Sequence, residues 1–109
     1  MVTIDDFARL DIRVGVIRSV EDHSAARKPM YKLSVDFGVE MGIRTIIAGI
    51  KDYYPVDELS GKKIVCLVNL DPKDIAGIKS EGMLLAAEDV NGISVLVPDK
   101  DVLEGSKIR

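Results

Sequence analysis

Polar and cationic side chains gather in one short stretch of the chain. Lys73 and Lys79 could each contact a phosphate group, while Asn69 and Ser80 could add adaptable hydrogen bonds. Met83 follows closely, and its flexible thioether side chain could press against a base or a ribose. The alternative interpretation is structural: Asn69 and Ser80 would cap turns, and Met83 would belong to the core. The residue types therefore favour a nucleic-acid contact, with a purely structural role as the alternative.

Residues suited to enzyme chemistry are scarce. The single histidine, His23, lies beside Asp22 and Ser24 in a polar segment. Catalytic triads draw their members from separate segments, so we expect His23 to be a solvated loop residue. The single cysteine, Cys66, lies between apolar neighbours, so we expect it to be buried and unreactive. One Cys and one His also exclude an internal disulfide and the common zinc sites. We expect no catalytic residue, no metal and no cofactor.

Length and composition predict one globular domain over residues 1–109, with 47% apolar and 5% aromatic residues. The longest apolar runs have five residues, which is too short for a membrane span or a signal sequence. We therefore expect no membrane insertion. Together with the single cysteine, this favours a protein of the reducing cytoplasm.

The charge is segregated along the chain. The 15 basic and 18 acidic residues give a net charge of −3, which argues mildly against a nucleic-acid partner. Residues 9–32, however, carry six cations against three acids, and residues 60–80 carry four against two. A protein that is acidic overall can in this way present a basic face. Ordinary surface scatter is the alternative.

Alternating apolar residues predict a series of short strands that must position these side chains. The strands are expected at 12–20, 31–37, 43–50, 63–70, 82–87 and 93–98, with a short extended piece at 75–78. Thr3 should cap a short helical turn, and residues 53–59 should form one or two more turns that stop at Gly61. Gly15 should mark a bulge or bend in the first strand, and Asn91-Gly92 a hairpin turn. Many short strands predict a small closed all-β barrel; a small open α+β sheet is the alternative.

Several segments, taken in order, resemble the tRNA-binding-domain family with an OB-fold. This family includes CsaA-type proteins and the C-terminal appendix of bacterial methionyl-tRNA synthetase. The segments that carry the resemblance are Phe7-Ala-Arg-Leu-Asp11-Ile-Arg-Val-Gly15, Ile47-Ala-Gly-Ile50, Tyr53-Tyr54-Pro55, Glu58-Leu-Ser-Gly-Lys62-Lys63, Asn69-Leu-Asp-Pro72, Ile75-Ala-Gly77, Ser80-Glu-Gly-Met83-Leu-Leu-Ala86-Ala87 and Val97-Pro-Asp99.

The resemblance implies a five-stranded OB-fold barrel with a short helix between the third and fourth strands and short N- and C-terminal extensions. It also implies a homodimer that binds tRNA by shape and backbone. Carried onto matching positions, it implies RNA-facing side chains at Lys32, Asn69, Lys73, Lys79, Ser80 and Met83.

Two features qualify this expectation. Asp71 and Asp74 interrupt the run of basic residues that family members often have around Lys73, which weakens the field that attracts phosphate. In addition, residues 25–42 resemble the CsaA-type branch, which is associated with chaperone-like binding of export-linked chains. The alternative function is therefore binding of unfolded or export-bound polypeptides through apolar surface.

Overall fold

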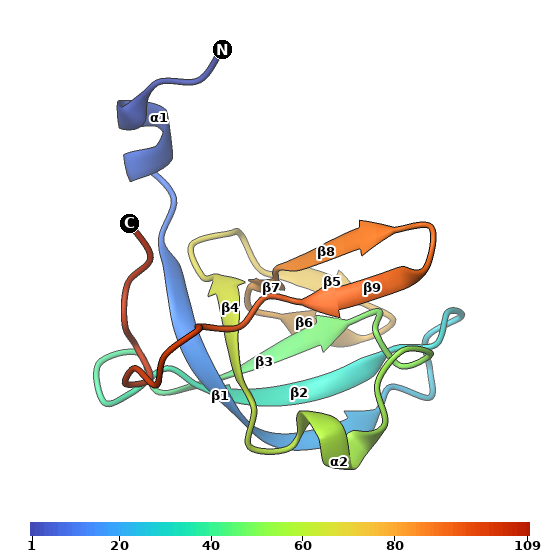
Figure 1. Cartoon of the computed structure of the whole chain (residues 1–109). Coiled ribbons are helices and arrows are strands. Elements are labelled where there is room, and N and C mark those ends of the chain that lie inside the picture. The colour runs from blue at the N-terminus through green and yellow to red at the C-terminus, as the bar shows by residue number, and fades with distance from the viewer.

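Five antiparallel strands form the main sheet of the computed structural model, which describes residues 1–109 (Figure 1). Their order in the sheet is β3-β2-β1-β4-β7. The bounds are β1 (Ile12–Asp22), β2 (Tyr31–Asp36), β3 (Ile43–Ala48), β4 (Lys63–Leu67) and β7 (Met83–Leu84). These strands match the predicted ones closely, because alternating β-branched residues on a half-buried surface favour extended backbone.

The sheet curls so that its two ends meet. The backbone N–H of Glu81 donates to the carbonyl of Thr45 on β3 at 2.8 Å, and the Thr45 N–H donates to Oε1 of Glu81 at 3.0 Å. These bonds nearly close the sheet into a barrel with an OB-like all-β fold, which confirms the predicted fold class. The short helix α2 (Val56–Leu59) lies between β3 and β4, as expected, and buries Leu59.

Strand β1 serves both halves of the barrel. Its first half pairs with β4 and its second half with β2, and the register shifts between Ile17 and Ser19, so Arg18 is the extra residue of a bulge. The bulge expected at Gly15 lies instead at Arg18, and the alternative expectation of a bend at Gly15 stays a prediction. Gly15 is needed for a different reason: a Cβ atom there would lie 2.5 Å from Val35 Cγ1 and 2.7 Å from Phe37 Cε1.

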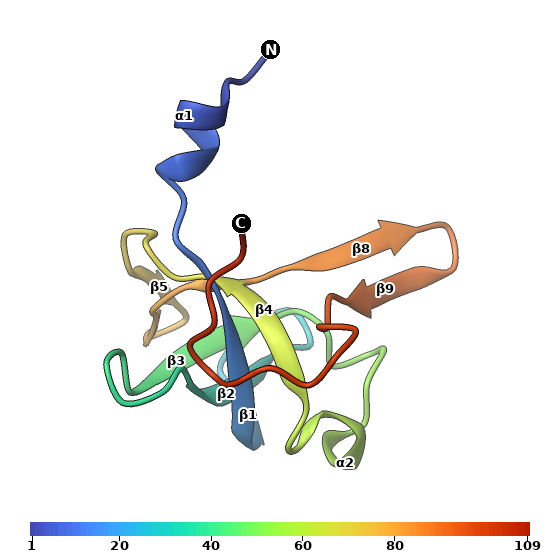
Figure 2. The same ribbon diagram turned by 60° about the vertical axis from the view of Figure 1, so that its left-hand side comes forward.

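The C-terminal tail forms hydrogen bonds with the first half of β1, along the edge that no strand occupies. The N–H of Val14 donates to the carbonyl of Ser106 at 2.9 Å, and the N–H of Ile108 donates to the carbonyl of Ile12 at 2.8 Å. At the other end of the chain, helix α1 (Ile4–Ala8) is capped by Thr3 and projects from the barrel (Figures 1 and 2). No residue of α1 is buried.

Two hairpins extend the barrel. The first joins β5 (Lys73–Ile75) to β6 (Ile78–Ser80), and the second joins β8 (Ala86–Asp89) to β9 (Gly92–Val95) and projects from the barrel in Figure 2. The extended piece predicted at 75–78 is wrong, because it contains the turn of the first hairpin. The predicted strand 82–87 is divided between β7 and β8. The hairpin expected at Asn91-Gly92 is confirmed.

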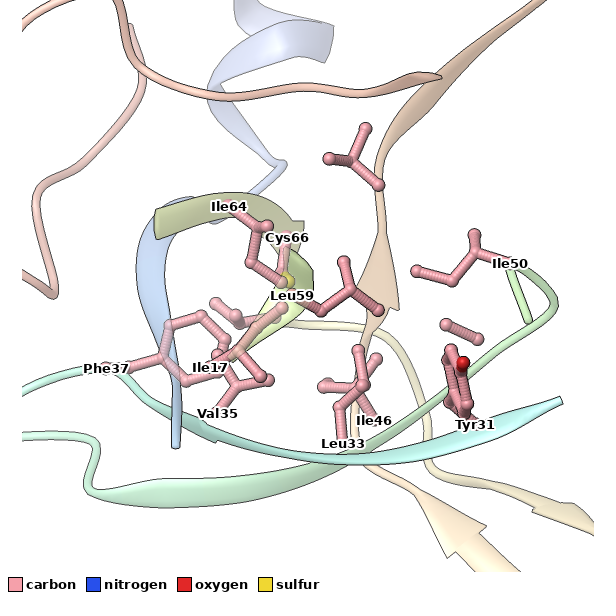
Figure 3. Packing of buried hydrophobic residues seen from close by; sticks show 13 residues of the cluster. Ile17, Tyr31, Leu33, Val35, Phe37, Ile46, Ile50, Leu59, Ile64 and Cys66 are labelled. Atoms are coloured by element: carbon pink, nitrogen blue, oxygen red, sulfur yellow. The ribbon is translucent and has the colours of Figure 1, made fainter. Parts of the chain in front are cut away.

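The barrel interior is filled by a cluster of 13 buried residues (Figure 3). The largest fully buried side chains include Phe37, Ile17, Leu33, Ile46 and Leu59. A smaller cluster of Ile12, Val65 and Leu67 lies apart and contacts Phe7, Leu85 and Ile108. This second cluster attaches the terminal segments to the barrel. None of the helices is both long enough and apolar enough to cross a membrane.

Candidate nucleic-acid interface

The β5–β6 hairpin carries two predicted contact residues on opposite faces. In its register Lys73 lies opposite Ser80, and Asp74 lies opposite Lys79. Side chains alternate along a strand and cross-strand partners share a face, so Lys73 projects on the face of Ser80 and Lys79 on the other face. Both lysines are exposed and neither forms an ion pair. The hairpin thus presents one free ammonium group on each face.

A tight turn with positive φ at both central residues presents these lysines. Ala76 has φ 50° and Gly77 has φ 90°, as in a type I′ hairpin turn. Oδ1 of Asp74 accepts a hydrogen bond from the N–H of Gly77 at 2.9 Å. Asp74 was expected only to weaken the field around Lys73. In the structure its carboxylate also stabilises the turn that joins the two lysine-bearing strands.

Ser80 supports the barrel from within. Only 4% of the residue is exposed. Its hydroxyl accepts a hydrogen bond from the N–H of Ile47 at 3.0 Å and donates one to the carbonyl of Gly82 at 3.1 Å. The burial and the two internal contacts favour the structural role that the sequence left as the alternative for Ser80, and an RNA contact at Ser80 stays an untested prediction.

Asn69 connects the end of β4 to the N-terminal segment. Its side-chain Oδ1 accepts from the N–H of Asp11 at 2.9 Å, and its Nδ2 donates to the carbonyl of Arg9 at 2.8 Å. The amide group is exposed at the surface but uses both of its ends inside the protein. Asn69 thus fixes residues 9–11, the segment that leads into β1. It forms no hydrogen bond with the β5–β6 hairpin.

Met83 lines an apolar groove beside the end of β3, and Lys32 lies across the sheet from one residue of that groove. Met83 is 46% exposed and lines a groove of about 220 Å³. Lys32 of β2 lies directly opposite Ile47 of β3, and Ile47 also lines this groove. Because cross-strand partners share a face, Lys32 projects from the same face of the sheet as Ile47. The residues that line the groove are Ile47, Ala48, Gly49, Ile50, Met83, Leu84, Ala86 and Ile93.

Ion pairs divide the basic residues into neutralised and free groups. The pairs join Arg13 to Asp11, Arg18 to Asp36 and Glu104, Lys51 to Asp22, and Lys63 to Asp101. Arg44 is also engaged, since it donates to the carbonyl of Val68 at 2.6 Å. The three lysines predicted to face RNA, Lys32, Lys73 and Lys79, form no ion pair. Their ammonium groups are thus not neutralised by an ion pair within the protein, and the same holds for other cations such as Arg27, Lys28 and Lys100.

His23 is buried, which overturns the expectation of a solvated loop residue. It is 5% exposed, and its Nε2 lies 2.6 Å from the carbonyl oxygen of Ile75 on β5. Sequence reasoning missed this role because the contact joins residues 52 positions apart. The polar neighbours Asp22 and Ser24 gave no signal of burial.

Cys66 behaves as the sequence indicates. It is fully buried in the main core, and burial raises the pKa of its thiol to about 12. A thiol with that pKa carries almost no thiolate near neutral pH and is a poor nucleophile. No group of three or more His, Cys, Asp and Glu side chains is placed to hold a metal ion.

A small OB-like barrel with unpaired lysines on a loop hairpin has the architecture of an oligonucleotide-binding module. The family model described as "Putative tRNA binding domain" matches residues 12–107. The chain therefore belongs to the tRNA-binding-domain family, as the resemblance in the sequence indicates.

Similar proteins include curated relatives and solved structures. The chain is 47% identical over 108 residues to a methionine–tRNA ligase of Pyrococcus horikoshii, and this match covers 99% of the chain. It is similar along its whole length to the crystal structure of the CsaA chaperone protein from Picrophilus torridus, with 43% identity and a TM-score of 0.95. It also matches a MetRS-related protein from Pyrococcus horikoshii, with 36% identity, a TM-score of 0.89 and coverage of 100% of this chain and 98% of that one. The chain spans only 14% of the length of the ligase.

Proposed function

We propose that this chain is a non-catalytic tRNA-binding protein that recognises tRNA by its shape and its phosphate backbone. The observation that carries the proposal is the pair of free lysines, Lys73 and Lys79, on a hairpin beside an OB-like barrel. Lys32 and Met83 extend the surface along the outer face of β2 and β3. With only 5% aromatic residues, contacts to phosphates and sugars suit the chain better than base stacking. Its place of action would be the cytoplasm, where tRNA is used.

The proposed active form is a homodimer. Support comes from apolar side chains that the terminal segments leave open: Ile4 on α1 is 79% exposed, and Leu103 in the tail is 77% exposed. A second subunit could cover them, and two copies of a weakly basic surface gain affinity by binding one large RNA together. Sedimentation of the protein and of Leu103→Asp would test this. A dimer that the substitution dissociates is expected; a monomeric parent protein would refute it.

The decisive experiment is a titration of tRNA over a series of salt concentrations. Each phosphate contact contributes about 0.7 to 0.9 to the slope of log K against log salt. We expect Lys73→Gln and Lys79→Gln each to lower the slope by about one such contact. The matched control is Lys100→Gln, which removes an exposed cation of the tail that forms no ion pair. A flat salt response of the parent protein would refute the proposal.

The opposite placement of Lys73 and Lys79 makes the two substitutions informative separately. If RNA wraps the edge of the hairpin, both lower the slope. If only one lowers it, RNA lies on that face alone. If neither lowers it, while the parent protein keeps a steep slope, the hairpin is not the binding site.

A second candidate function is binding of unfolded polypeptides. The observation that favours it is the apolar groove that Met83 lines; two similar solved structures are described as CsaA chaperones, from Picrophilus torridus and from Bacillus anthracis. Burial of apolar surface is not screened by salt, so client binding should persist at high salt. Ala86→Asn, on the exposed side of the groove, should weaken it and leave the salt slope for tRNA unchanged, because an amide adds polarity without charge. Suppression of client aggregation that disappears on adding salt would count against this function.

A further inference from the structure

His23 connects two loops that the sequence places far apart. It follows β1 directly, and its Nε2 lies 2.6 Å from the carbonyl oxygen of Ile75 on β5. A carbonyl only accepts hydrogen bonds, so Nε2 carries the proton and donates it. The backbone of His23 is fixed as well: its N–H donates to the carbonyl of Met30 at 3.0 Å, and its carbonyl accepts from the N–H of Ala26 at 3.1 Å.

This bond is the one hydrogen bond between the β1–β2 loop, residues 23–30, and the β5–β6 hairpin. In Figure 1 the loop and the turn of the hairpin lie beside each other on the same side of the barrel. Most of the loop is exposed, so little else fixes its position relative to the hairpin. The imidazole of His23 therefore forms the main polar contact between the β1–β2 loop and the β5–β6 hairpin.

The loop carries two cations, Arg27 and Lys28, that, like the two lysines of the hairpin, are exposed and form no ion pair. Pro29 restricts the backbone of Lys28, which limits how far the loop can rearrange. Two carboxylates nearby have contacts within the protein: Asp22 forms an ion pair with Lys51 at 3.0 Å, and Asp74 accepts the hydrogen bond of the hairpin turn. Two others, Glu21 and Asp71, are exposed and form no ion pair.

We propose that the His23–Ile75 hydrogen bond makes the β1–β2 loop and the β5–β6 hairpin one phosphate-binding surface. Arg27 and Lys28 are further RNA contacts on it, and His23 is the positioning residue. This inference rests on the proposed tRNA-binding function. The physical reason is preorganisation: cations already held at a fixed spacing bind neighbouring phosphates without the cost of ordering the loop first.

The contact residues are tested by the salt series on Arg27→Gln/Lys28→Gln. Removing two phosphate contacts should lower the slope by about 1.4 to 1.8. The control, Lys100→Gln/Arg109→Gln, removes one lysine and one arginine from exposed positions of the tail and should leave the slope unchanged. An unchanged slope in the loop variant overturns the inference.

The positioning role is tested by two substitutions at His23. His23→Leu keeps a similar volume without a donor and should weaken tRNA binding about threefold to tenfold. His23→Gln places an amide N–H near the position of Nε2 and should restore most of the affinity. Equal affinity for both variants and the parent protein overturns the role.

A double-mutant comparison separates positioning from plain stabilisation. If His23 places the loop, the loss caused by Arg27→Gln/Lys28→Gln becomes smaller in the His23→Leu background, since a free loop contributes less. If His23 only stabilises the fold, that loss is the same in both backgrounds, and the positioning role is refuted. Should His23→Leu fail to fold, His23→Asn, whose shorter amide does not reach the carbonyl of Ile75, takes its place in both comparisons, and an affinity equal to that of the parent protein overturns the positioning role.

The experiment also distinguishes the two levels of the proposal. A parent protein with a flat salt response refutes tRNA binding altogether. A steep slope that Lys73→Gln and Lys79→Gln reduce, and that Arg27→Gln/Lys28→Gln leaves unchanged, refutes only the extension to the β1–β2 loop.

Discussion

The phenol oxygen of Tyr54 accepts a hydrogen bond from the backbone N–H of Val95 at 3.0 Å. This contact ties β9 to the segment that follows β3, and Tyr31 strengthens the junction by donating its hydroxyl to the carbonyl of Tyr54 at 2.7 Å. The β8–β9 hairpin pairs with no other strand, so this junction orients it on the barrel.

We expect Tyr54→Phe to lower the free energy of unfolding by about 1 to 3 kcal/mol, because it leaves the N–H of the buried residue Val95 without a partner. Urea unfolding measures the change. The neighbouring substitution Tyr53→Phe is a matched control, since Tyr53 is 47% exposed and its hydroxyl makes no hydrogen bond in the protein. Equal effects of the two substitutions would contradict the role given to the Tyr54 hydroxyl.

Gly15→Ala should destabilise the barrel by about 1 to 3 kcal/mol through overpacking. The added Cβ would lie within 3 Å of both Val35 and Phe37, which are fully buried. Gly49→Ala is the control, because its Cβ would meet only the end of Met30 at 3.7 Å. Thermal unfolding of both variants provides the measurement. A Gly15→Ala protein as stable as the control would contradict the prediction and would show that the neighbouring core side chains shift to accommodate the added Cβ.

Ala76→Asn should stabilise the β5–β6 hairpin. Ala76 has φ 50°, a left-handed conformation that costs a residue with a Cβ about 1 to 2 kcal/mol and that asparagine tolerates better. Hydrogen exchange of the hairpin amides measures the effect locally, and slower exchange is expected. Ala25→Asn, in a loop position without positive φ, should not change it. Faster exchange in Ala76→Asn would contradict the assignment of the turn.

Ser80→Ala should affect stability more than RNA binding. The substitution leaves the N–H of buried Ile47 without its acceptor, which costs about 1 to 3 kcal/mol. The salt slope for tRNA should stay that of the parent protein, since the hydroxyl makes its contacts inside the protein. A lower slope with unchanged stability would restore Ser80 to the contact surface.

Asp36 should contribute to the acid sensitivity of the fold. A hydrogen bond from the N–H of Gly38, and after it the contact with Arg18, lower the pKa of Asp36 below its ordinary value of 3.8. A carboxyl with a lowered pKa in the folded state stabilises the fold above its unfolded pKa and loses that effect as the pH falls through the folded value.

Asp36→Asn is therefore expected to be less stable than the parent protein near neutral pH, with a difference that narrows below about pH 4. Urea unfolding at several pH values measures this difference. Asp99→Asn, at an exposed position without an ion pair, should show no such trend. A difference for Asp36→Asn that is independent of pH would contradict the argument.

The strands and the barrel could be predicted because they follow from local pattern. The alternation of Tyr31, Leu33 and Val35 specifies one buried face, and all three are buried. The turn at Ala76 could not be found this way, because alanine rarely adopts positive φ and Ile75-Ala76-Gly77-Ile78 has the pattern of an extended segment.

At the candidate site, the sequence alone predicts which lysines are exposed. It does not predict which backbone groups the polar side chains bind. Lys73 and Lys79 are exposed as expected. Ser80, Asn69 and His23 all make contacts between distant parts of the chain, and a polar residue gives the same signal in a sequence whether its partner is solvent, a ligand or a remote backbone group. Only the fold shows which partner each has.

The pairing of the C-terminal tail with β1 has a consequence for biosynthesis. Ser106 and Ile108 leave the ribosome after every other strand of the barrel, yet they fill the edge beside Val14 and Ile12. During synthesis each molecule thus passes through a stage in which β1 has backbone N–H and C=O groups without partners. Another polypeptide could pair with them as an added strand. Emergence of residues 106–108 from the ribosome is the step that ends this hazard.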